Sequence, residues 1–174
     1  MSSRKRLSHV DARGAARMVD VADKPETART ATASAAVKMR RETLRLVERV
    51  GGARGKGDVL AVARLAGIMA ARRTAELIPL CHPIRLTSCE VDLEVDRALP
   101  GVRIVATARA VDRTGVEMEA MVAAATAALT VYDMVKGAER EVEVVAVRLE
   151  EKAGGRSGHW LRRMKPIARG RASK

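Results

Sequence analysis

Apolar and polar residues alternate along four segments of the chain, and such alternation is typical of half-buried β-strands. In residues 29–39, every second position is apolar. Residues 86–96 and 101–111 repeat the pattern and are joined by a short link, which predicts a hairpin. Residues 140–152 predict a last strand, whose alternation slips at Val144–Val145 and therefore indicates a bulge.

The predicted hairpin collects its charged residues on one face. Acidic residues alternate with apolar ones in the first strand, and arginines take the corresponding positions of the second. Opposite charges across an exposed face stabilise a strand pair. We therefore interpret the acidic run as a solvated sheet face rather than a metal site, with Cys89 on the side that faces the core.

Three further segments have the periodicity of α-helices. The first covers residues 40–50, and the second covers residues 58–73 with Asp58 as a suitable N-cap. The second is apolar over most of its surface, so we expect it to be buried centrally or against another subunit. The longest helix is predicted over residues 115–136. Its expected apolar stripe consists of Met118, Met121, Val122, Ala125, Leu129 and Tyr132.

These elements mix without a strict β-α-β repeat, which predicts an α+β fold: an antiparallel sheet packed on helices, ferredoxin-like in character, in a single domain. The chain has 174 residues with one Trp, one Tyr and no Phe. Its core must consist of small aliphatic side chains, so we expect closely packed elements and room for a large subunit interface. We place the domain at residues 18–158, with a flexible basic tail at residues 1–17 and a disordered basic tail at residues 159–174.

The formal net charge of +12 is concentrated near the two ends of the chain. Residues 1–17 carry +4 and residues 153–174 carry +7, which leaves +1 for the residues between them. Basic tails bind polyanions weakly and without specificity. The sequence has no RNP-type aromatic motif, zinc finger or basic helix, so we expect no specific nucleic-acid partner. A basic-tailed nucleic-acid-binding module without enzymatic activity is the rival hypothesis.

Cysteine usage and hydropathy bear on the cellular compartment. Cys81 and Cys89 are the two cysteines and form no CxxC motif, so the sequence indicates neither a disulfide framework nor a zinc signature. We expect no hydrophobic run long enough to span a bilayer, and residues 1–14 lack the apolar stretch of a secretory signal. These features predict a cytoplasmic protein that does not bind membranes.

A glycine-rich loop, GGARGKG, occupies residues 51–57 and contains Lys56. The loop resembles a phosphate-binding P-loop, but Val50 stands at the first glycine of that motif and Gly57 at its Ser or Thr. A plain loop before a capped helix and a functional lysine both remain open.

The long helix carries its charges near its two ends. Glu117 and Glu119 lie in the first turn, where the helix dipole favours acids. Asp133 lies near the other end, where an acid is disfavoured, and Lys136 is one turn further on. This pair is either structural or an acid/base device. Glu119 and Asp133 would lie about 21 Å apart along the helix axis, so a site that uses both needs a second subunit.

Cys81 and His82 lie between two prolines, which favour extended or turn geometry. A metal site would need further ligands, and the other two histidines lie in or near the tails. Neighbours in an extended segment point to opposite faces, so we expect one of the pair to be buried and the other presented. His82 is the one that can transfer protons near neutral pH, although a turn histidine without a catalytic role remains open.

Six motifs together resemble the cyclic pyranopterin monophosphate synthase family, molybdenum cofactor biosynthesis protein C. They are MVDV (18–21), KGDV (56–59), LIPLCHP (77–83), TGVEMEA (114–120), ALTVYDMVK (128–136) and KAGGRSG (152–158). The resemblance implies conversion of 3′,8-cyclo-7,8-dihydroguanosine 5′-triphosphate, supplied by a radical cyclase, into cyclic pyranopterin monophosphate. It further implies that pyrophosphate is released by general acid/base catalysis, without a metal or redox cofactor. The resemblance also implies a homohexamer, a trimer of dimers with active sites at the dimer interface.

The resemblance assigns roles to residues through these motifs. The catalytic residues it implies are Asp133, Lys56 and Lys136. The substrate-binding residues it implies are Leu80, Cys81, His82, Glu117, Met118 and Glu119, to which we add Arg40, Lys152 and Arg156 as candidate phosphate contacts. A triphosphate that loses pyrophosphate needs cations on its oxygens. The family usually has lysine at the position of Arg156, so the charge is kept but a neutral amine is excluded.

Overall fold

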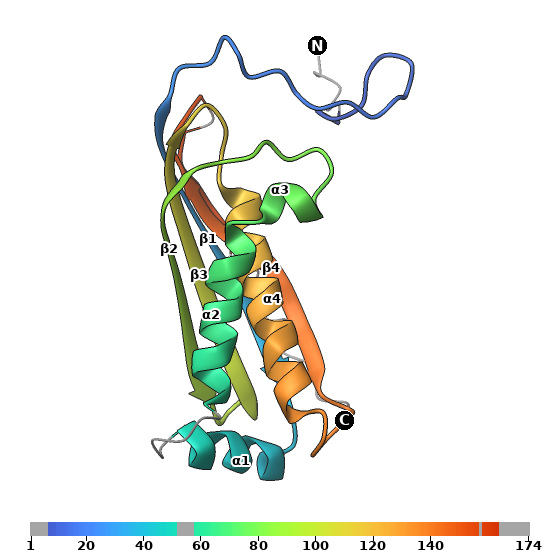
Figure 1. Ribbon diagram of the computed structural model, residues 1–174, viewed down its shortest axis with the longest axis vertical. Helices are drawn as coiled ribbons and strands as arrows, with labels where there is room; N and C mark the ends of the chain where they lie inside the picture. The colour runs from blue at the N-terminus through green and yellow to red at the C-terminus, as the bar shows by residue number, and fades with distance from the viewer. Residues whose placement is uncertain (1–6, 52–57, 157, 164–174) are drawn as a thin grey trace, which may run out of the picture.

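Five antiparallel strands form one sheet in the part of the chain that the computed structural model describes, which is residues 7–51, 58–156 and 158–163 (Figure 1). The elements in chain order are β1 (Thr27–Lys38), α1 (Arg41–Gly51), α2 (Val59–Ala71), α3 (Thr74–Leu77), β2 (Leu86–Asp96), β3 (Gly101–Asp112), α4 (Glu117–Val135), β4 (Glu143–Ala153) and β5 (Trp160–Leu161). The strand order in the sheet is β2-β3-β1-β4-β5.

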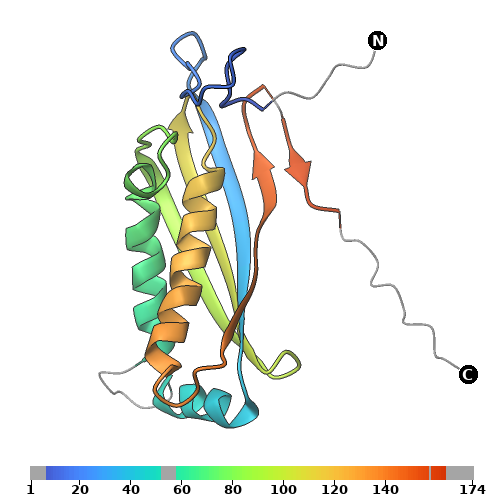
Figure 2. The same cartoon turned by 90° about the vertical axis from the view of Figure 1, so that its right-hand side faces the viewer.

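The helices cover one face of the sheet. Helices α2 and α4 lie side by side along it, α1 crosses one end of the molecule, and α3 lies near the other end (Figures 1 and 2). Strand β1 lies between β3 and β4, with helices in the connections from β1 to β2 and from β3 to β4. This order is the ferredoxin-like one, so the predicted α+β class and single-domain arrangement are confirmed.

The long elements agree with the sequence-based expectations to within a few residues. Asp58 is the N-cap of α2, because its Oδ1 accepts the backbone N–H groups of Leu60 at 2.9 Å and Ala61 at 3.1 Å. Helix α3 was not predicted, since a single turn of four residues shows no periodicity.

The hairpin of β2 and β3 carries its charges on the exposed face, as predicted. Nη1 of Arg109 donates to Oε1 of Glu90 at 2.6 Å, and Arg103 pairs with Asp96. Cys89 is half-buried and packs against the core, so its predicted orientation is confirmed.

Strand β4 contains a bulge, but it lies slightly later than predicted. Val144 and Val145 pair regularly with β1, and the register shifts at the following residues. Ala146 has a φ of 60°, which is uncommon for a residue other than glycine and fits the irregular backbone of a bulge.

The sheet continues past the domain boundary that we placed at Gly158. Trp160 and Leu161 form β5 and pair with β4. Nε of Arg162 donates to the carbonyl oxygen of Leu149 at 2.6 Å. A strand therefore occupies the beginning of the segment that we expected to be disordered.

The core consists of small side chains that allow close packing, as the composition predicts. Gly67 of α2 faces α4, and a Cβ atom added there would lie 2.8 Å from the carbonyl oxygen of Ala123. The buried side of α4 is made of alanine and valine together with one acid. These residues are Glu119, Ala120, Val122, Ala123, Ala124, Ala127, Ala128, Val131 and Val135.

The apolar stripe that we predicted for α4 is only partly turned toward the core, where Met121 and Tyr132 pack beside the buried Val122. Of its members Val122 is buried, whereas Leu129 is 59% exposed and the others are half-buried. The alanines of α4 lie on its buried side and let it approach the sheet and α2 closely, whereas Leu129 lies on the exposed side. Helix α4 is therefore apolar all round, which is typical of a helix buried on every side.

By length and composition alone, α4 could cross a membrane, which differs from our expectation that no segment could. Its alanine-rich side is buried against the sheet. We therefore assign α4 as the core helix of the domain.

Candidate functional site

The N-terminal end of α4 and the segment after α3 border a cavity of about 250 Å³. Its wall includes all six residues that the LCH and EME motifs contribute to our substrate-binding set. These are Leu80, Cys81, His82, Glu117, Met118 and Glu119. The fold thus brings together two motifs that are far apart in the sequence.

The segment that contains Cys81 and His82 is not extended throughout. The backbone N–H of Cys81 donates to the carbonyl oxygen of Ile78 at 3.0 Å, which closes a turn. Both Cys81 and His82 contribute to the cavity wall. Both residues are half-buried, so the expected division into one buried and one presented residue is not found.

His9 also lines this cavity, and the sequence analysis did not find it. Its Nδ1 lies 3.3 Å from the carbonyl oxygen of Arg17, which holds the N-terminal segment in place. The position lies in the segment that we interpreted as a tail, so neither periodicity nor a motif marks it.

Glu119 is the buried acid of this site, with 3% of its surface exposed. Burial raises its pKa to about 7, against the effect of a hydrogen bond from its own backbone amide. The negative charges of Glu117 and Asp112 raise the pKa further. A carboxyl group with a pKa near 7 is suited to both accepting and donating a proton at neutral pH.

The Cys81 thiol is not activated. Burial raises its pKa, and the negative charge of Glu119 adds to this effect. Because the thiolate is the reactive form, a raised pKa argues against a nucleophilic role. The geometry therefore favours Cys81 as part of the wall of the cavity.

A second cavity, of about 490 Å³, adjoins the first. Thr114, Gly115 and Glu117 line both cavities. Five cationic side chains line the second one, and they come from segments far apart in the chain. They are Lys24, Arg29, Arg113, Lys152 and Arg156. A concentration of cations around one cavity is suited to binding phosphate oxygens.

Three of these cations, Lys24, Arg29 and Arg113, were missed by the sequence analysis. The chain contains 33 basic residues, and only the fold shows which of them converge. A weak signal exists at Arg113, which directly precedes the TGVEMEA motif.

Contacts around the basic cavity hold its side chains in place. Nζ of Lys152 donates to Oε1 of Glu117 at 2.7 Å. The Arg29 guanidinium donates to the carbonyl oxygens of Asp112 and Arg113, each at 3.3 Å. Gly155 has a φ of 70°, and a Cβ atom there would collide with this guanidinium at 1.5 Å. The glycine therefore lets Arg29 reach the cavity.

Asp133 and Lys136 form an ion pair at the other end of α4. Nζ of Lys136 donates to Oδ1 of Asp133 at 2.6 Å, and the hydrogen bond and charge of Asp133 raise the pKa of Lys136. Both side chains are more than half exposed, so the predicted pair is present but is not buried within a single chain.

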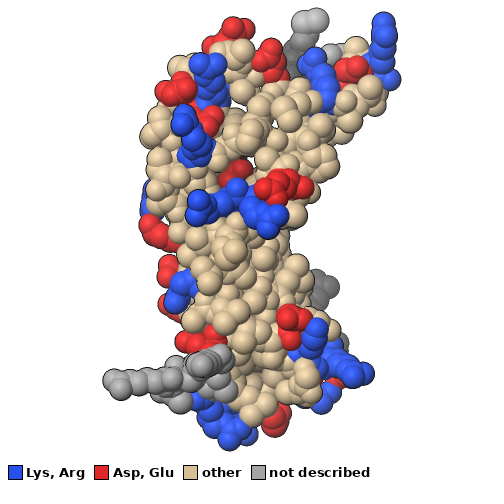
Figure 3. All heavy atoms as spheres, viewed as in Figure 1, with Lys and Arg blue, Asp and Glu red and all other residues tan. Residues whose placement is uncertain are grey.

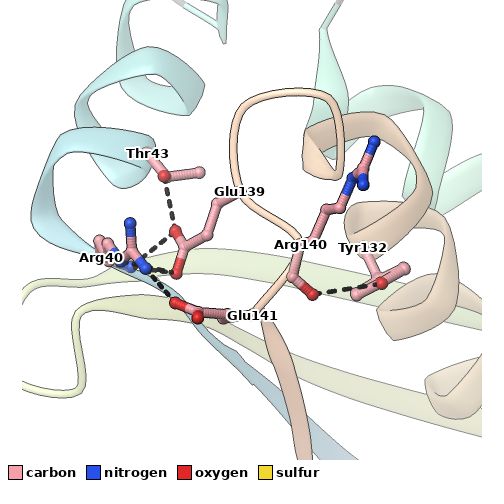
Figure 4. Close-up of polar contacts among 6 residues, drawn as sticks. All are labelled: Arg40, Thr43, Tyr132, Glu139, Arg140 and Glu141. Carbon is pink, nitrogen blue, oxygen red and sulfur yellow. Dashed lines mark hydrogen bonds and ion pairs between the residues drawn. The ribbon is translucent and has the colours of Figure 1, made fainter.

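Arg40 lies near this second end, beside α1, and not at the basic cavity. Its guanidinium pairs with Glu141 and lies 3.8 Å from Oε1 of Glu139 (Figure 4). Two carboxylates therefore lie beside it within one chain, where it does not border the basic cavity, and its role as a phosphate contact stays a prediction.

Two remaining expectations concern Lys56 and metal ions. Lys56 lies outside the described residues, between α1 and α2. Within residues 7–51, 58–156 and 158–163, no group of three or more His, Cys, Asp or Glu side chains is arranged to hold a metal ion.

Uncharged surface lies over α2 and α4, between the charged residues at the two ends of the molecule (Figure 3). The exposed apolar residues of these two helices include Val62, Leu65 and Met69 of α2, which are 44%, 59% and 55% exposed, and Leu129 of α4. Exposed apolar residues in one stripe are typical of an interaction surface.

The family model and the similar curated proteins point to the same family. The sequence model of the MoaC family matches residues 18–155. The chain is 60% identical over 154 residues to a cyclic pyranopterin monophosphate synthase of Methylobacterium sp. (strain 4-46), covering 88% of this chain and 95% of the relative. It is 59% identical to the enzyme of that name from Thermomicrobium roseum, over 90% of this chain and 93% of the relative. It is 54% identical to the one from Brucella ovis, over 89% and 93% respectively.

Proposed function

We propose how the two adjoining cavities of this chain perform the reaction of its family. The chain belongs to the MoaC family and is an enzyme of molybdenum cofactor biosynthesis. The substrate is 3′,8-cyclo-7,8-dihydroguanosine 5′-triphosphate, and the products are cyclic pyranopterin monophosphate and pyrophosphate. The comparisons give no support to the rival hypothesis of a nucleic-acid-binding module.

One observation carries this proposal: a cavity with proton-transfer groups adjoins a cavity lined by five cations. The substrate joins a guanine-derived ring system to a triphosphate, so it needs both kinds of surroundings side by side. The ring system occupies the cavity of His82 and Glu119. The triphosphate extends into the basic cavity, where Lys152 and Arg156 bind its oxygens together with Arg29 and Arg113.

The chemistry requires proton transfers and a stabilised leaving group. Ring opening and reclosure need proton transfers, for which the Glu119 carboxyl, with its pKa raised by burial to about 7, and the His82 imidazole are placed in the cavity. A hydroxyl oxygen of the substrate's sugar bonds to the α-phosphorus and gives its proton to a base of the site, which closes the cyclic monophosphate. In the same step the bond breaks between the α-phosphorus and the oxygen that bridges it to the β-phosphate, and pyrophosphate leaves. Cations on the β- and γ-phosphate oxygens stabilise the charge that develops on that leaving group.

Asp133 and Lys136 act in the same site but come from a second subunit, and Lys56 contributes to catalysis. A helix rises 1.5 Å per residue, so Asp133 lies about 21 Å from Glu119 along α4. Two copies of α4 that run in opposite directions across a two-fold axis would bring the Asp133 end of one to the Glu119 end of the other. The exposed apolar residues of α2 and α4 provide surface for this dimer, and three dimers form a hexamer.

The cellular setting follows from the same proposal. The enzyme works in the cytoplasm on a substrate that a radical cyclase supplies. Catalysis uses the ionisable side chains of the protein and no resident metal or redox cofactor.

The direct test supplies the cyclic triphosphate to the purified chain and measures pyrophosphate and the pterin product. We expect turnover by the wild type and its loss in Asp133→Asn and Lys56→Ala, with the fold retained. A correctly assembled wild type that releases no pyrophosphate would contradict the proposal.

A further inference from the structure

Glu139 is a buried carboxylate outside both cavities, in the connection from α4 to β4. It is 7% exposed, and its carboxylate accepts hydrogen bonds from the beginning of α1 (Figure 4). The donors are the backbone N–H of Arg40, at 2.9 Å from Oε2, and the hydroxyl of Thr43, at 2.6 Å from the same oxygen. The same N–H lies 3.2 Å from Oε1.

These bonds give α1 a cap that is distant in sequence. The first N–H groups of a helix have no partner within the helix, and a neighbouring Ser, Thr, Asp or Asn usually caps them. Arg40 directly precedes α1 and takes the N-cap position, because its carbonyl oxygen accepts the N–H of Leu44 at 3.0 Å. Its side chain cannot act as an acceptor. Glu139 supplies the missing acceptor from a position 99 residues later.

The backbone of Glu139 is fixed to the last turn of α4. Its N–H donates to the carbonyl oxygen of Val135 at 3.1 Å. The hydroxyl of Tyr132 donates to the carbonyl oxygen of Arg140 at 3.4 Å, which ties the next residue to the same turn. Asp133 and Lys136 belong to this turn, so one residue links the ion pair of the proposed site to α1.

The charge state of Glu139 is consistent with a fixed anion. Burial by itself would raise the pKa of Glu139, but the Thr43 hydroxyl, the Arg40 amide and the Arg40 charge together hold it below its usual value. The carboxylate therefore stays ionised at neutral pH, where it accepts all of these hydrogen bonds.

The ion pair depends on such support because it is exposed at a helix end. The last turn of a helix frays easily when nothing holds it. Leu44 and Val47 anchor α1 in the core, with 4% and 3% of their surfaces exposed. Attachment to α1 therefore gives the last turn of α4 a fixed reference in the body of the domain.

We propose that Glu139 is a positioning residue, which holds the last turn of α4 against the beginning of α1 and thereby places Asp133 and Lys136 for catalysis. This inference rests on the proposed function. A purely structural role would lower stability and leave the turnover of the folded enzyme unchanged. A positioning role lowers kcat in folded enzyme, because small displacements of catalytic groups cost large factors in rate.

The test compares Glu139→Gln with Glu48→Gln. Glu48 lies on α1 and pairs with the exposed Arg97 at 2.9 Å, so its substitution removes a carboxylate from α1 and leaves the hydrogen bonds between Glu139 and α1 in place. At a temperature where both variants are folded and assembled, we expect Glu139→Gln to lower kcat about 10- to 100-fold, with KM within about threefold of the wild type. Glu48→Gln should keep the wild-type kcat.

The Thr43 hydroxyl allows a rescue experiment. Thr43→Val removes the hydrogen bond to Glu139 and should lower kcat in the same direction, by a smaller factor. Thr43→Ser retains the hydroxyl and should therefore have a kcat close to that of the wild type. If folded Glu139→Gln keeps the wild-type kcat, the positioning role is refuted.

Amide hydrogen exchange separates this inference from the proposed function. In Glu139→Gln we expect faster exchange both at the beginning of α1 and in the last turn of α4, around Asp133–Lys136. If the wild type shows no turnover, the proposed function fails, and exchange alone decides about Glu139. Unchanged exchange in the last turn of α4 would refute the link whatever the turnover of the wild type.

Discussion

Glu119 and Asp133 lie at opposite ends of α4, about 21 Å apart along the helix axis. Glu119 is buried beside a cavity, whereas Asp133 is exposed in an ion pair with Lys136. A site that uses both acids therefore needs a second copy of the chain.

The exposed apolar residues of α2 should mediate this association. Leu65 is 59% exposed, and burying its side chain would contribute about 2 kcal/mol to the interface. We expect Leu65→Glu to shift the protein toward monomers in light-scattering measurements of molar mass. Leu161 of β5 is 60% exposed and serves as the matched control. Loss of assembly in Leu161→Glu but not in Leu65→Glu would contradict this placement of the interface.

Glu119 should make stability depend on pH. Because folding raises its pKa from 4.5 to about 7, the folded state binds the proton more tightly than the unfolded state. The free energy of unfolding therefore falls as pH rises from about 4.5 to about 7, by an amount on the order of 3 kcal/mol.

The variant Glu119→Gln tests this dependence. It should match the wild type near pH 4.5 and exceed it at pH 8 in denaturant titrations. If the free energy of unfolding of the two proteins has the same pH dependence, burial of Glu119 does not destabilise the folded state as the pH rises.

Gly67 should be required for the close packing of α2 on α4. A Cβ atom there would lie 2.8 Å from the carbonyl oxygen of Ala123, so Gly67→Ala must force the helices apart. We expect a loss of about 1–3 kcal/mol in the free energy of unfolding. Gly137 is the control, since a Cβ atom there meets nothing within 4 Å. Gly137→Ala should be neutral or slightly stabilising, and equal losses in both variants would contradict the packing argument.

His82 and Cys81 should differ in their effect on turnover although both line the cavity. We expect His82→Ala to lower kcat by about 10²- to 10⁴-fold if the imidazole transfers a proton. Cys81→Ser should change kcat only a few-fold, because burial raises the pKa of its thiol and keeps it protonated. The reverse order of effects in steady-state kinetics would assign the chemistry to the thiol.

The fold could be predicted from the sequence wherever one face of a helix or strand meets solvent and the other meets the core. In the hairpin of β2 and β3, charged and apolar residues separate onto two faces, so alternation alone predicts both strands. Helix α4 shows the opposite case. It is apolar all round, so periodicity could not show that its alanines face the sheet while Leu129 faces outward.

The residues of the candidate site could be predicted from the sequence only where they form contiguous motifs. The residues around His82 and Glu119 lie in two short motifs and line one cavity. The cations Lys24, Arg29 and Arg113 come together because the beginning of β1 pairs with the end of β3 in the antiparallel sheet, which is a property of topology. His9 reaches the cavity from the N-terminal segment, where no periodic pattern indicates a position.

Mixing two inactive variants tests the shared active site most directly. Glu119→Gln and Asp133→Asn, each inactive alone, are combined so that hybrid oligomers form, and release of pyrophosphate from the cyclic triphosphate is measured. Random pairing in a two-fold dimer would leave about one quarter of the sites with both wild-type acids, so we expect about one quarter of the wild-type activity. Hybrids that form but remain inactive, while the wild type turns over, would contradict an active site built from two subunits.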